Sequence, residues 1–205
     1  MAQGVTFGEV VECLSRPGLS LFCGREFRGP VMAASLFPLL RGGRVVVVDG
    51  GNMFDPYVLS RACRMVRVDP SRVFSRVFVA RGFTCHQVER LVTSSLPRFV
   101  REHPPSVLVA MGILESFYDA DVSFREASRL FGRVRSVLRG LARHFPLPVV
   151  SPPPPLVAGG RRVFFRCLAE EARSVYGLRE GEGGRRAERV LPAGEEISGE
   201  GGEQG

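Results

Sequence analysis

Residues 44–56 decide the fold of this chain and read Arg-Val-Val-Val-Val-Asp-Gly-Gly-Asn-Met-Phe-Asp-Pro. A nearly all-valine run is typical of a strand that is buried on both faces, as in a parallel sheet covered by helices. Asp55 and Pro56 then mark a helix start, because aspartate caps the first turn and proline fits into it. A buried strand that leads directly into a helix indicates an α/β fold.

The same alternation of strand and helix extends over the body of the chain. Capping boxes predict two further helix starts, at Thr84-Cys-His-Gln87 and Ser123-Phe-Arg-Glu126. We expect strands over residues 19–23, 44–48, 76–80, 107–111 and 147–150, and helices over residues 31–40, 55–66, 84–102, 123–144 and 162–176. This alternation predicts a mostly parallel sheet with helices on both faces. Ligands of such sheets bind beyond the carboxyl ends of the strands.

The composition is that of a globular protein of the cell interior. The 205 residues are 44% hydrophobic and 24% charged, which suits one domain. No apolar run approaches the roughly 20 residues of a membrane-spanning helix, and residues 1–9 lack the order of a signal peptide. The five cysteines form no CxxC pair, which favours reduced thiols over disulfides or a zinc site. We therefore expect an intracellular protein of the cytoplasm, nucleoid or nucleus, with no metal and no membrane contact.

Arginine alone carries the basic charge, because the chain contains no lysine. Residues 1–178 hold 24 Arg against 14 Asp and Glu, a net charge of +10. This charge favours polyanionic partners such as nucleic acid, although ordinary solvated faces would give the same balance. Residues 179–205 are rich in Gly and Glu and poor in aromatic and β-branched residues, a composition typical of disorder. We therefore predict a domain over residues 1–178 and a disordered tail over residues 179–205.

A degenerate phosphate-binding loop follows the first predicted strand. Residues 24–31 read Gly-Arg-Glu-Phe-Arg-Gly-Pro-Val, and their glycines have the spacing of the GxxxxGK[ST] loop. Pro30 and Val31 stand where that loop has the lysine that meets the β- and γ-phosphates and the hydroxyl that holds Mg²⁺. Proline also lacks a backbone N–H, so no resident cofactor is expected. Weak nucleotide binding would depend on four residues: Gly24, Arg25, Arg28 and Gly29.

Two neighbouring segments resemble RecA/RadA-type recombinases. Residues 45–56 are similar to the second-strand segment of that family, in which a strand that ends in Asp and then Glu leads into a helix start. Residues 68–87 resemble the archaeal and eukaryotic branch, and their most specific part reads Ala80-Arg-Gly-Phe-Thr-Cys-His-Gln87. The resemblance covers residues 18–151. It implies a RecA-like P-loop core that lacks the N-terminal DNA-binding extension of the full recombinases.

The resemblance also implies that the catalytic set of the family is missing. Pro30 and Val31 replace the lysine and threonine of the phosphate loop, and Gly51 replaces the glutamate that activates water. Met111 or Gly112 replaces the metal-associated aspartate. Without these groups nothing remains to bind Mg²⁺, position the γ-phosphate or activate water. The expected protein is a pseudo-ATPase and not an enzyme.

A role in DNA repair or recombination follows from the same resemblance. Such a paralogue would dock on a partner recombinase or paralogue subunit, contact single-stranded DNA, or do both. Two alternatives stay open: a switch subunit that binds a nucleotide without hydrolysing it, and a structural partner protein with no DNA role. Arg161 and Arg162 lie where family members carry a mobile DNA-binding loop. Each could contact a backbone phosphate or merely flank the last helix.

Several other chemistry-bearing residues have an ordinary structural interpretation. We expect Asp49 to be a turn residue and His86 to pack locally in the first turn of its helix. The acidic residues Glu115, Asp119 and Asp121 are expected to mark the entry to a helix and not a metal site. Adjacent residues on a helix point apart, so Cys85 and His86 are not expected to share a site.

The helix predicted over residues 123–144 is rich in arginine. We expect these arginines to form a solvated outer face, opposite an apolar face. The helix begins with Phe124-Arg-Glu-Ala127, which matches the FxxA pattern that recombinase subunits use to dock on each other. Both apolar residues of that pattern would also suit the buried face of a helix.

Overall fold

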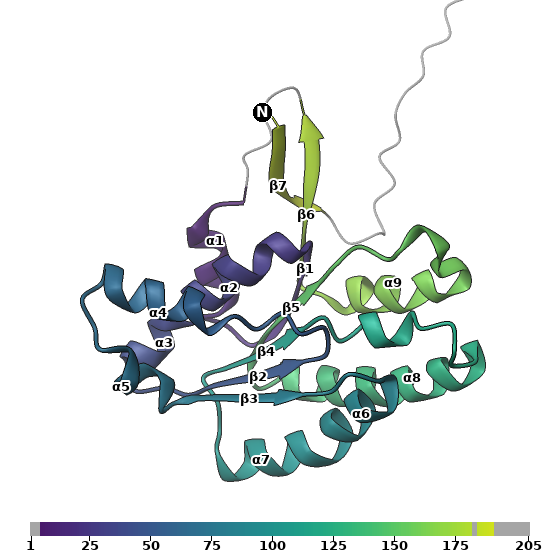
Figure 1. Cartoon of the computed structure of the whole chain (residues 1–205), viewed down its shortest axis with the longest axis horizontal. Coiled ribbons are helices and arrows are strands. Elements are labelled where there is room, and N and C mark those ends of the chain that lie inside the picture. Colours follow the sequence, from purple (N-terminus) through teal and green to yellow (C-terminus); the bar gives the residue numbers. More distant parts are fainter. Residues whose placement is uncertain (1–4, 182–183, 191–205) are drawn as a thin grey trace, which may run out of the picture.

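The computed structural model describes residues 5–181 and 184–190 and shows an α/β fold built on a seven-stranded sheet (Figure 1). The strand order is β3-β2-β4-β5-β1-β6-β7. The strands are β1 (Gly18–Cys23), β2 (Val45–Asp49), β3 (Val77–Arg81), β4 (Val107–Met111), β5 (Pro146–Ser151), β6 (Ser174–Gly181) and β7 (Gly184–Val190). The first six strands in this order are parallel, and β7 is antiparallel to β6. The predicted fold class is confirmed, and the arrangement is consistent with a RecA-like α/β core.

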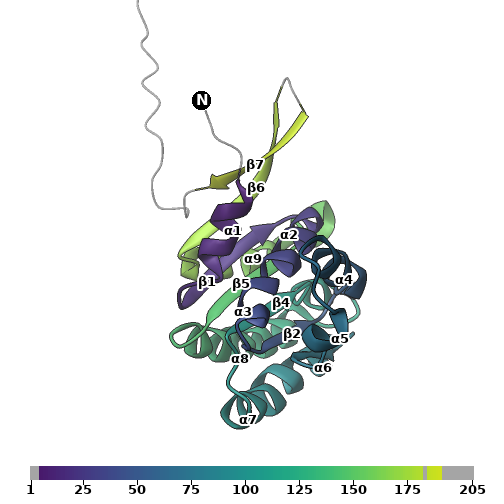
Figure 2. The same ribbon diagram turned by 90° about the vertical axis from the view of Figure 1, so that its left-hand side faces the viewer.

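Helices cover both faces of the sheet (Figures 1 and 2). The helices are α1 (Phe7–Cys13), α2 (Arg28–Ala34), α3 (Leu36–Leu40), α4 (Pro56–Met65), α5 (Pro70–Phe74), α6 (Cys85–Arg90), α7 (Leu96–Glu102), α8 (Phe124–Ala142) and α9 (Arg162–Glu171). The first five pack on one face of the sheet and α6 to α9 pack on the other. None of the helices in the described part of the chain is long and apolar enough to cross a membrane.

The valines of β2 show why this strand decides the fold. Val45 and Val47 pack into the core on the side of α1 to α5, and Val46 and Val48 pack into the core on the other side. All four are almost completely buried. The expectation of a strand buried on both faces is therefore confirmed.

The predicted helix caps are present, but their reciprocal contacts differ. The Thr84 hydroxyl accepts the N–H of Gln87, and the Ser123 hydroxyl accepts the N–H of Glu126. Gln87 reaches back to the N–H of Phe83, one residue before the cap. The Glu126 carboxylate instead contacts a side chain of α6. A local contact thus replaces the return bond of the first expected capping box, and a tertiary contact replaces that of the second.

Two predicted helices are interrupted. Residues 31–40 divide at Ser35 into α2 and α3, and the Ser35 hydroxyl donates to the carbonyl of Val31 at 2.9 Å. The helix predicted over residues 84–102 contains a π-helical turn, Leu91–Ser95, between α6 and α7. Pro97 lies in the first turn of α7. Because proline has no N–H to donate, the regular hydrogen-bond ladder is disturbed at this point.

The predicted last helix was wrong at its C-terminal end. The helix α9 ends at Glu171, and the chain continues into β6, which pairs in parallel with β1. The ring of Tyr176 stacks on Phe22 with centroids 4.9 Å apart, and both side chains are buried. Burial against β1 therefore decides the conformation of these residues, and a helical continuation would lose it.

The structure also differs from the expectation of a disordered tail that begins at Arg179. Residues 179–181 complete β6, and residues 184–190 form β7. The two strands make a hairpin in which Glu180 is opposite Arg185 and Gly181 is opposite Gly184. The hairpin projects beyond the helical layers (Figure 2). The remaining residues of the predicted tail, 182–183 and 191–205, lie outside the described residues.

Candidate functional site

The predicted nucleotide site lies at the carboxyl edge of the sheet, where β1, β2 and β4 end. At this edge β1 ends at Cys23 and Gly24 follows with φ 141°, a backbone conformation that favours glycine. Residues 25–27 form a 3₁₀ turn, and α2 begins at Arg28. Gly29 and Pro30 therefore lie inside the first turn of a helix. The two glycines of the GxxxxG spacing do not enclose an open loop.

Two of the backbone amides of this connection are engaged within the protein. The N–H of Gly24 donates to the carbonyl of Ser151, and the N–H of Phe27 donates back to the carbonyl of Gly24. Phe27 is buried in the core below α2. A phosphate loop needs several N–H groups that point at one anion. Of the four predicted nucleotide-binding residues, only Arg25 and Arg28 present an exposed side chain.

Arg25 is held by Glu115, which comes from the 3₁₀ turn Glu115–Phe117 after β4. The Arg25 Nη2 and Glu115 Oε2 atoms are 2.5 Å apart. The other carboxylate oxygen of Glu115 is buried without a hydrogen-bond partner among the described residues. Burial raises the pKa of Glu115, Arg25 opposes this rise, and the charge of Asp49 adds to it. The ion pair thus joins the connections that follow β1 and β4, across the carboxyl edge.

Glu115 fills the space beside two glycines. A Cβ atom added to Gly51 would lie 2.3 Å from Glu115 Oε1, and one added to Gly112 would lie 2.8 Å from it. Both glycines stand at positions where the resemblance places acidic catalytic residues. No side chain fits at either position while Glu115 keeps this place. Sequence reasoning weighed Glu115 only as a residue of an acidic loop and missed this packing, which depends on contacts between separate strands.

Asp49 stabilises the connection between β2 and α4. Its buried carboxylate accepts the N–H of Met53 at 2.8 Å and the N–H of Phe54 at 3.1 Å. Arg81, at the end of the neighbouring strand β3, pairs with the same carboxylate at 3.2 Å. The interpretation of Asp49 as a turn residue is confirmed. Both of its oxygen atoms accept hydrogen bonds from these protein donors.

Arg161 is turned into the protein and holds a loop. Its Nη1 atom donates to the carbonyl of Phe117 at 2.8 Å, and its Nη2 atom donates to the carbonyl of Val122. The guanidinium therefore ties the start of α9 to the connection between β4 and α8. A DNA phosphate would have to compete with these carbonyls for Arg161. Arg162 is exposed at the first position of α9.

The acidic connection before α8 offers no cation site among the described residues. Asp119 accepts the N–H of Asp121 at 3.0 Å, which is a local turn contact. Within the described ranges, no group of three or more His, Cys, Asp and Glu side chains is placed to hold a metal ion.

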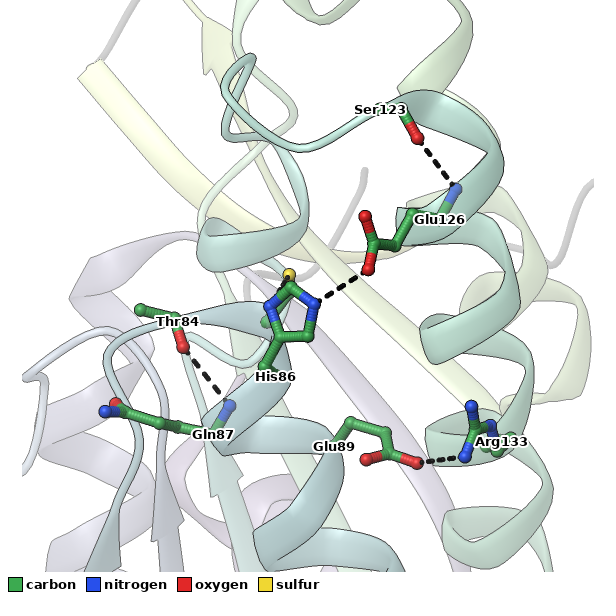
Figure 3. A network of polar contacts seen from close by, with 8 residues as sticks. Thr84, His86, Gln87, Glu89, Ser123, Glu126 and Arg133 are labelled. Atoms are coloured by element: carbon green, nitrogen blue, oxygen red, sulfur yellow. Dashed lines mark hydrogen bonds and ion pairs between the residues drawn. The ribbon is translucent and has the colours of Figure 1, made fainter.

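Polar contacts join α6 to α8 (Figure 3). His86 Nε2 lies 2.9 Å from Glu126 Oε1, and Glu89 pairs with Arg133 at 2.9 Å. Cys85 Sγ lies 3.6 Å from His86 Nδ1. The prediction that Cys85 and His86 point apart was therefore wrong, and so was the prediction that His86 packs only locally. The two ring nitrogens of His86 thus face different neighbours: Nδ1 lies near Cys85 and Nε2 lies near Glu126.

This row of Cys, His and Glu does not have the properties of a catalytic thiol site. The Cys85 side chain is buried, and burial raises the pKa of its thiol, with the charge of Glu126 adding to the rise. A nucleophilic cysteine needs access to its substrate and a lowered pKa. We therefore interpret the network in Figure 3 as a connection between two helices.

The arginines of α8 are partly paired, and of the two apolar residues of its FxxA pattern only Ala127 lies in the core. Glu171 of α9 binds Arg135 at 2.8 Å and lies 3.7 Å from Arg139. Ala127 is completely buried, and the half-exposed ring of Phe124 stacks on Phe164. The expectation of a buried helix face is confirmed for Ala127 of the FxxA pattern, whereas Phe124 remains half exposed.

A second candidate site lies along the edge strand β3. A groove of about 650 Å³ runs beside this strand between β3, the π-helical turn and α7. We call it the β3 groove, and its lining residues are Val46, Val77, Phe78, Val79, Ala80, Leu91, Ser95, Leu96, Arg98, Phe99 and Glu102. Sequence reasoning missed it, because no local pattern shows which strand lies at the edge of a sheet.

Comparisons with protein families and with curated proteins identify no relative of this chain. No protein-family model matches the chain, and no curated protein is significantly similar to it in sequence.

Proposed function

We propose that this chain is a non-catalytic RecA/RadA-like paralogue that acts in DNA repair or recombination. It docks on a partner recombinase subunit through the β3 groove, and its basic surface contacts single-stranded DNA. The observation that carries this proposal is the β3 groove, which lies beside a strand edge that is open to pairing. The degenerate phosphate loop supports a role in binding over a role in catalysis.

The outer edge of β3 offers backbone groups to an incoming strand. On its inner side, the N–H of Val45 donates to the carbonyl of Arg76, and the N–H of Gly82 donates to the carbonyl of Asp49. In a parallel ladder, alternate residues of a strand bond to the same neighbour. Val79 and the residues two positions away therefore direct their N–H and C=O groups outward. An extended segment of a partner can add to such an edge as a further strand.

The side chains of the groove suit an apolar anchor on that segment. The rings of Phe78 and Phe99 lie 5.1 Å apart and contribute aromatic surface. Arg98 and Glu102 pair with each other along α7 and add polar groups to the lining. The π-helical turn also lines the groove, and such turns occur frequently at functional sites. The partner segment is thus expected to be extended, with an aromatic or aliphatic side chain facing α7.

Docking is tested with the purified recombinase of the same organism. Val79→Pro removes one outward N–H without touching the ladder to β2, and proline is tolerated on strand edges. We expect this variant to bind the recombinase at least tenfold more weakly in calorimetry. Val79→Ala is the matched control, because it shortens the side chain and keeps the N–H. Equal binding by wild type and Val79→Pro would reject docking at this edge.

DNA contact is tested separately, by fluorescence anisotropy of a labelled single strand across a salt series. Binding by a basic surface should weaken linearly in a plot of log affinity against log salt. It should not change when ATP is added. The substitution Arg162→Ala, at the exposed start of α9, should reduce the slope by about one if this residue contacts a phosphate. A chain that docks normally but binds no DNA at low salt would leave a docking role alone.

A further inference from the structure

A second groove lies on the opposite face of the sheet, between α1, α3 and α4. It has a volume of about 370 Å³. We call it the apolar groove, and its lining residues are Phe7, Ala33, Leu36, Phe37, Leu40, Ala62, Met65 and Val66. Every lining side chain is apolar. The proposed function uses none of them.

The apolar groove concentrates the exposed apolar surface of the molecule. Nine large apolar side chains are exposed among the described residues, and five of the nine line this groove. Met65 is 81% exposed, and the rings of Phe7 and Phe37 lie 6.2 Å apart at the side of α1. A monomeric soluble protein rarely leaves such a group of side chains in water unless it binds something. The groove is therefore a candidate interaction surface.

Four exposed arginines lie on or next to the helices α3 and α4, which contribute most of the groove lining. Arg41 follows α3, Arg61 and Arg64 lie on α4, and Arg67 comes two residues after the end of α4. None of the four forms an ion pair with another of the described residues. The groove thus combines an apolar floor with unpaired positive charge on the elements that form it.

The carboxylates of the surrounding elements are already engaged. Glu9 accepts the N–H of Thr6 in the capping box of α1. Asp55 accepts the N–H of Tyr57, and Asp69 accepts the N–H of Ser71, as caps of α4 and α5. These groups stabilise helix starts. The four arginines therefore form no ion pair with the carboxylates that the structure describes, and they can meet those of a partner.

We propose that the apolar groove binds an acidic amphipathic helix of a partner protein. Its apolar side chains, spaced by three and four residues, enter the groove, as in other helix-in-groove complexes. Its Glu and Asp side chains face the four arginines of the surrounding elements, because opposite charges on the two proteins select this partner over others. A second copy of the chain fits less well, since a two-fold interface would bring the four arginines of one copy close to those of the other.

The test uses the full chain and a synthetic, fluorescein-labelled helical peptide of 18 residues. Leu occupies the positions of one helical stripe, and Glu and Ala occupy the others. Two control peptides are used: one has the same composition with the stripe scrambled, and one has Lys in place of Glu. We expect anisotropy to show saturable binding of the first peptide and at least tenfold weaker binding of both controls. Failure of the first peptide to bind, or equal binding of all three, would overturn the proposal.

Variants locate the peptide on the protein. Met65→Ser changes an exposed side chain and leaves the core intact, and it should weaken binding about tenfold. The double change Arg61→Glu and Arg64→Glu should have at least the same effect, and raising the salt should reduce the difference. Arg101→Glu, an exposed arginine on α7 beyond the sheet, is the matched control and should bind as wild type does. Binding that is insensitive to both groove variants would overturn the proposal.

Sedimentation velocity decides between the partner helix and a second copy. We expect a monomer over the concentration range of the binding experiment. A dimer that forms with rising concentration, and that Met65→Ser dissociates, would show that the groove holds a second copy and would overturn the proposal. This test does not involve the β3 groove, so docking of a recombinase can fail while the apolar groove still binds the peptide.

Discussion

The two carboxylate oxygens of Glu115 have different surroundings at the carboxyl edge of the sheet. One carboxylate oxygen pairs with Arg25, and the other is buried beside Gly51 and Gly112 without a donor among the described residues. A buried polar atom without a partner costs free energy. The pKa of this carboxyl is raised accordingly, mainly by burial. Protonation of Glu115 therefore favours the folded state.

The substitution Glu115→Gln tests this assignment through the pH dependence of stability. A raised folded-state pKa gives stability that is fully present below the unfolded-state pKa and is lost as the pH rises through the folded-state pKa. Glutamine does not titrate. We expect the Tm of wild type to fall relative to that of Glu115→Gln as the pH rises from about 4 to about 7. Parallel Tm curves over this range would contradict the raised pKa.

Arg161 is expected to contribute to stability through its two backbone contacts. Arg161→Ala removes both donors from the carbonyls of Phe117 and Val122, which should cost about 1–3 kcal/mol of unfolding free energy. Urea denaturation measures this cost, and hydrogen exchange should show faster opening of residues 117–122. Arg166→Ala, which affects an exposed pair within α9, is the control and should change stability by no more than about 0.5 kcal/mol. Equal stability of the two variants would mean that Arg161 does not hold the loop.

At the scale of elements, the sequence predicts helix starts that have a capping side chain, whereas the start expected at residue 31 was wrong, because α2 begins at Arg28 without such a cap. The caps Asp55, Thr84 and Ser123 act through contacts over two or three residues, and all three are present. The end of α9 and the start of β6 depend on pairing with β1, more than 150 residues away in the chain. Local patterns carry no information about that pairing, so residues 174–176 were assigned to a helix.

Tyr176 provides the test of β6 as part of the sheet. Tyr176→Ala removes a buried ring that stacks on Phe22, and the loss should be about 3–5 kcal/mol, as for other large aromatic side chains. Tyr176→Phe keeps the stacked ring and removes only the hydroxyl, which lies 3.3 Å from Cys13 Sγ. It should therefore remain close to wild type in chemical denaturation. A near-normal Tyr176→Ala variant would argue against the position of β6 beside β1.

At the scale of the whole molecule, the degenerate phosphate loop predicts that nucleotide does not change the thermal stability of the chain. The β1–α2 connection lacks lysine and forms a short turn instead of a cradle. A ligand that binds only the folded state at 100 times its Kd adds roughly 2.7 kcal/mol of stability. We expect no rise in Tm with millimolar ATP and Mg²⁺. A clear rise would favour the nucleotide-binding switch over the proposed paralogue.

The fold and the two grooves differ in how far the sequence predicts them. Repeated strand and helix signals predict the parallel sheet, because each is a local pattern of apolar residues. The residues of the β3 groove and the apolar groove come from separate helices and strands, so only tertiary packing brings them together. The position of Glu115 beside Gly51 and Gly112 is of the same kind. Sites that depend on several elements were accordingly missed.

The two edges of the sheet differ, and this difference limits what the chain can assemble into. The β3 edge offers a groove, whereas β7 has the sequence Gly-Arg-Arg-Ala-Glu-Arg-Val, and charged residues on an edge strand discourage pairing. A row of subunits joined head to tail can grow only if every subunit has both a segment that docks on its neighbour, the donor, and a groove that receives such a segment, the acceptor. Ala127 of the FxxA pattern is buried while Phe124 is half exposed, so the pattern would have to leave α8 before it could act as the donor. If the proposed docking at β3 holds and the chain supplies no donor of its own, it would occupy one end of a row of recombinase subunits and act as a terminator of that row.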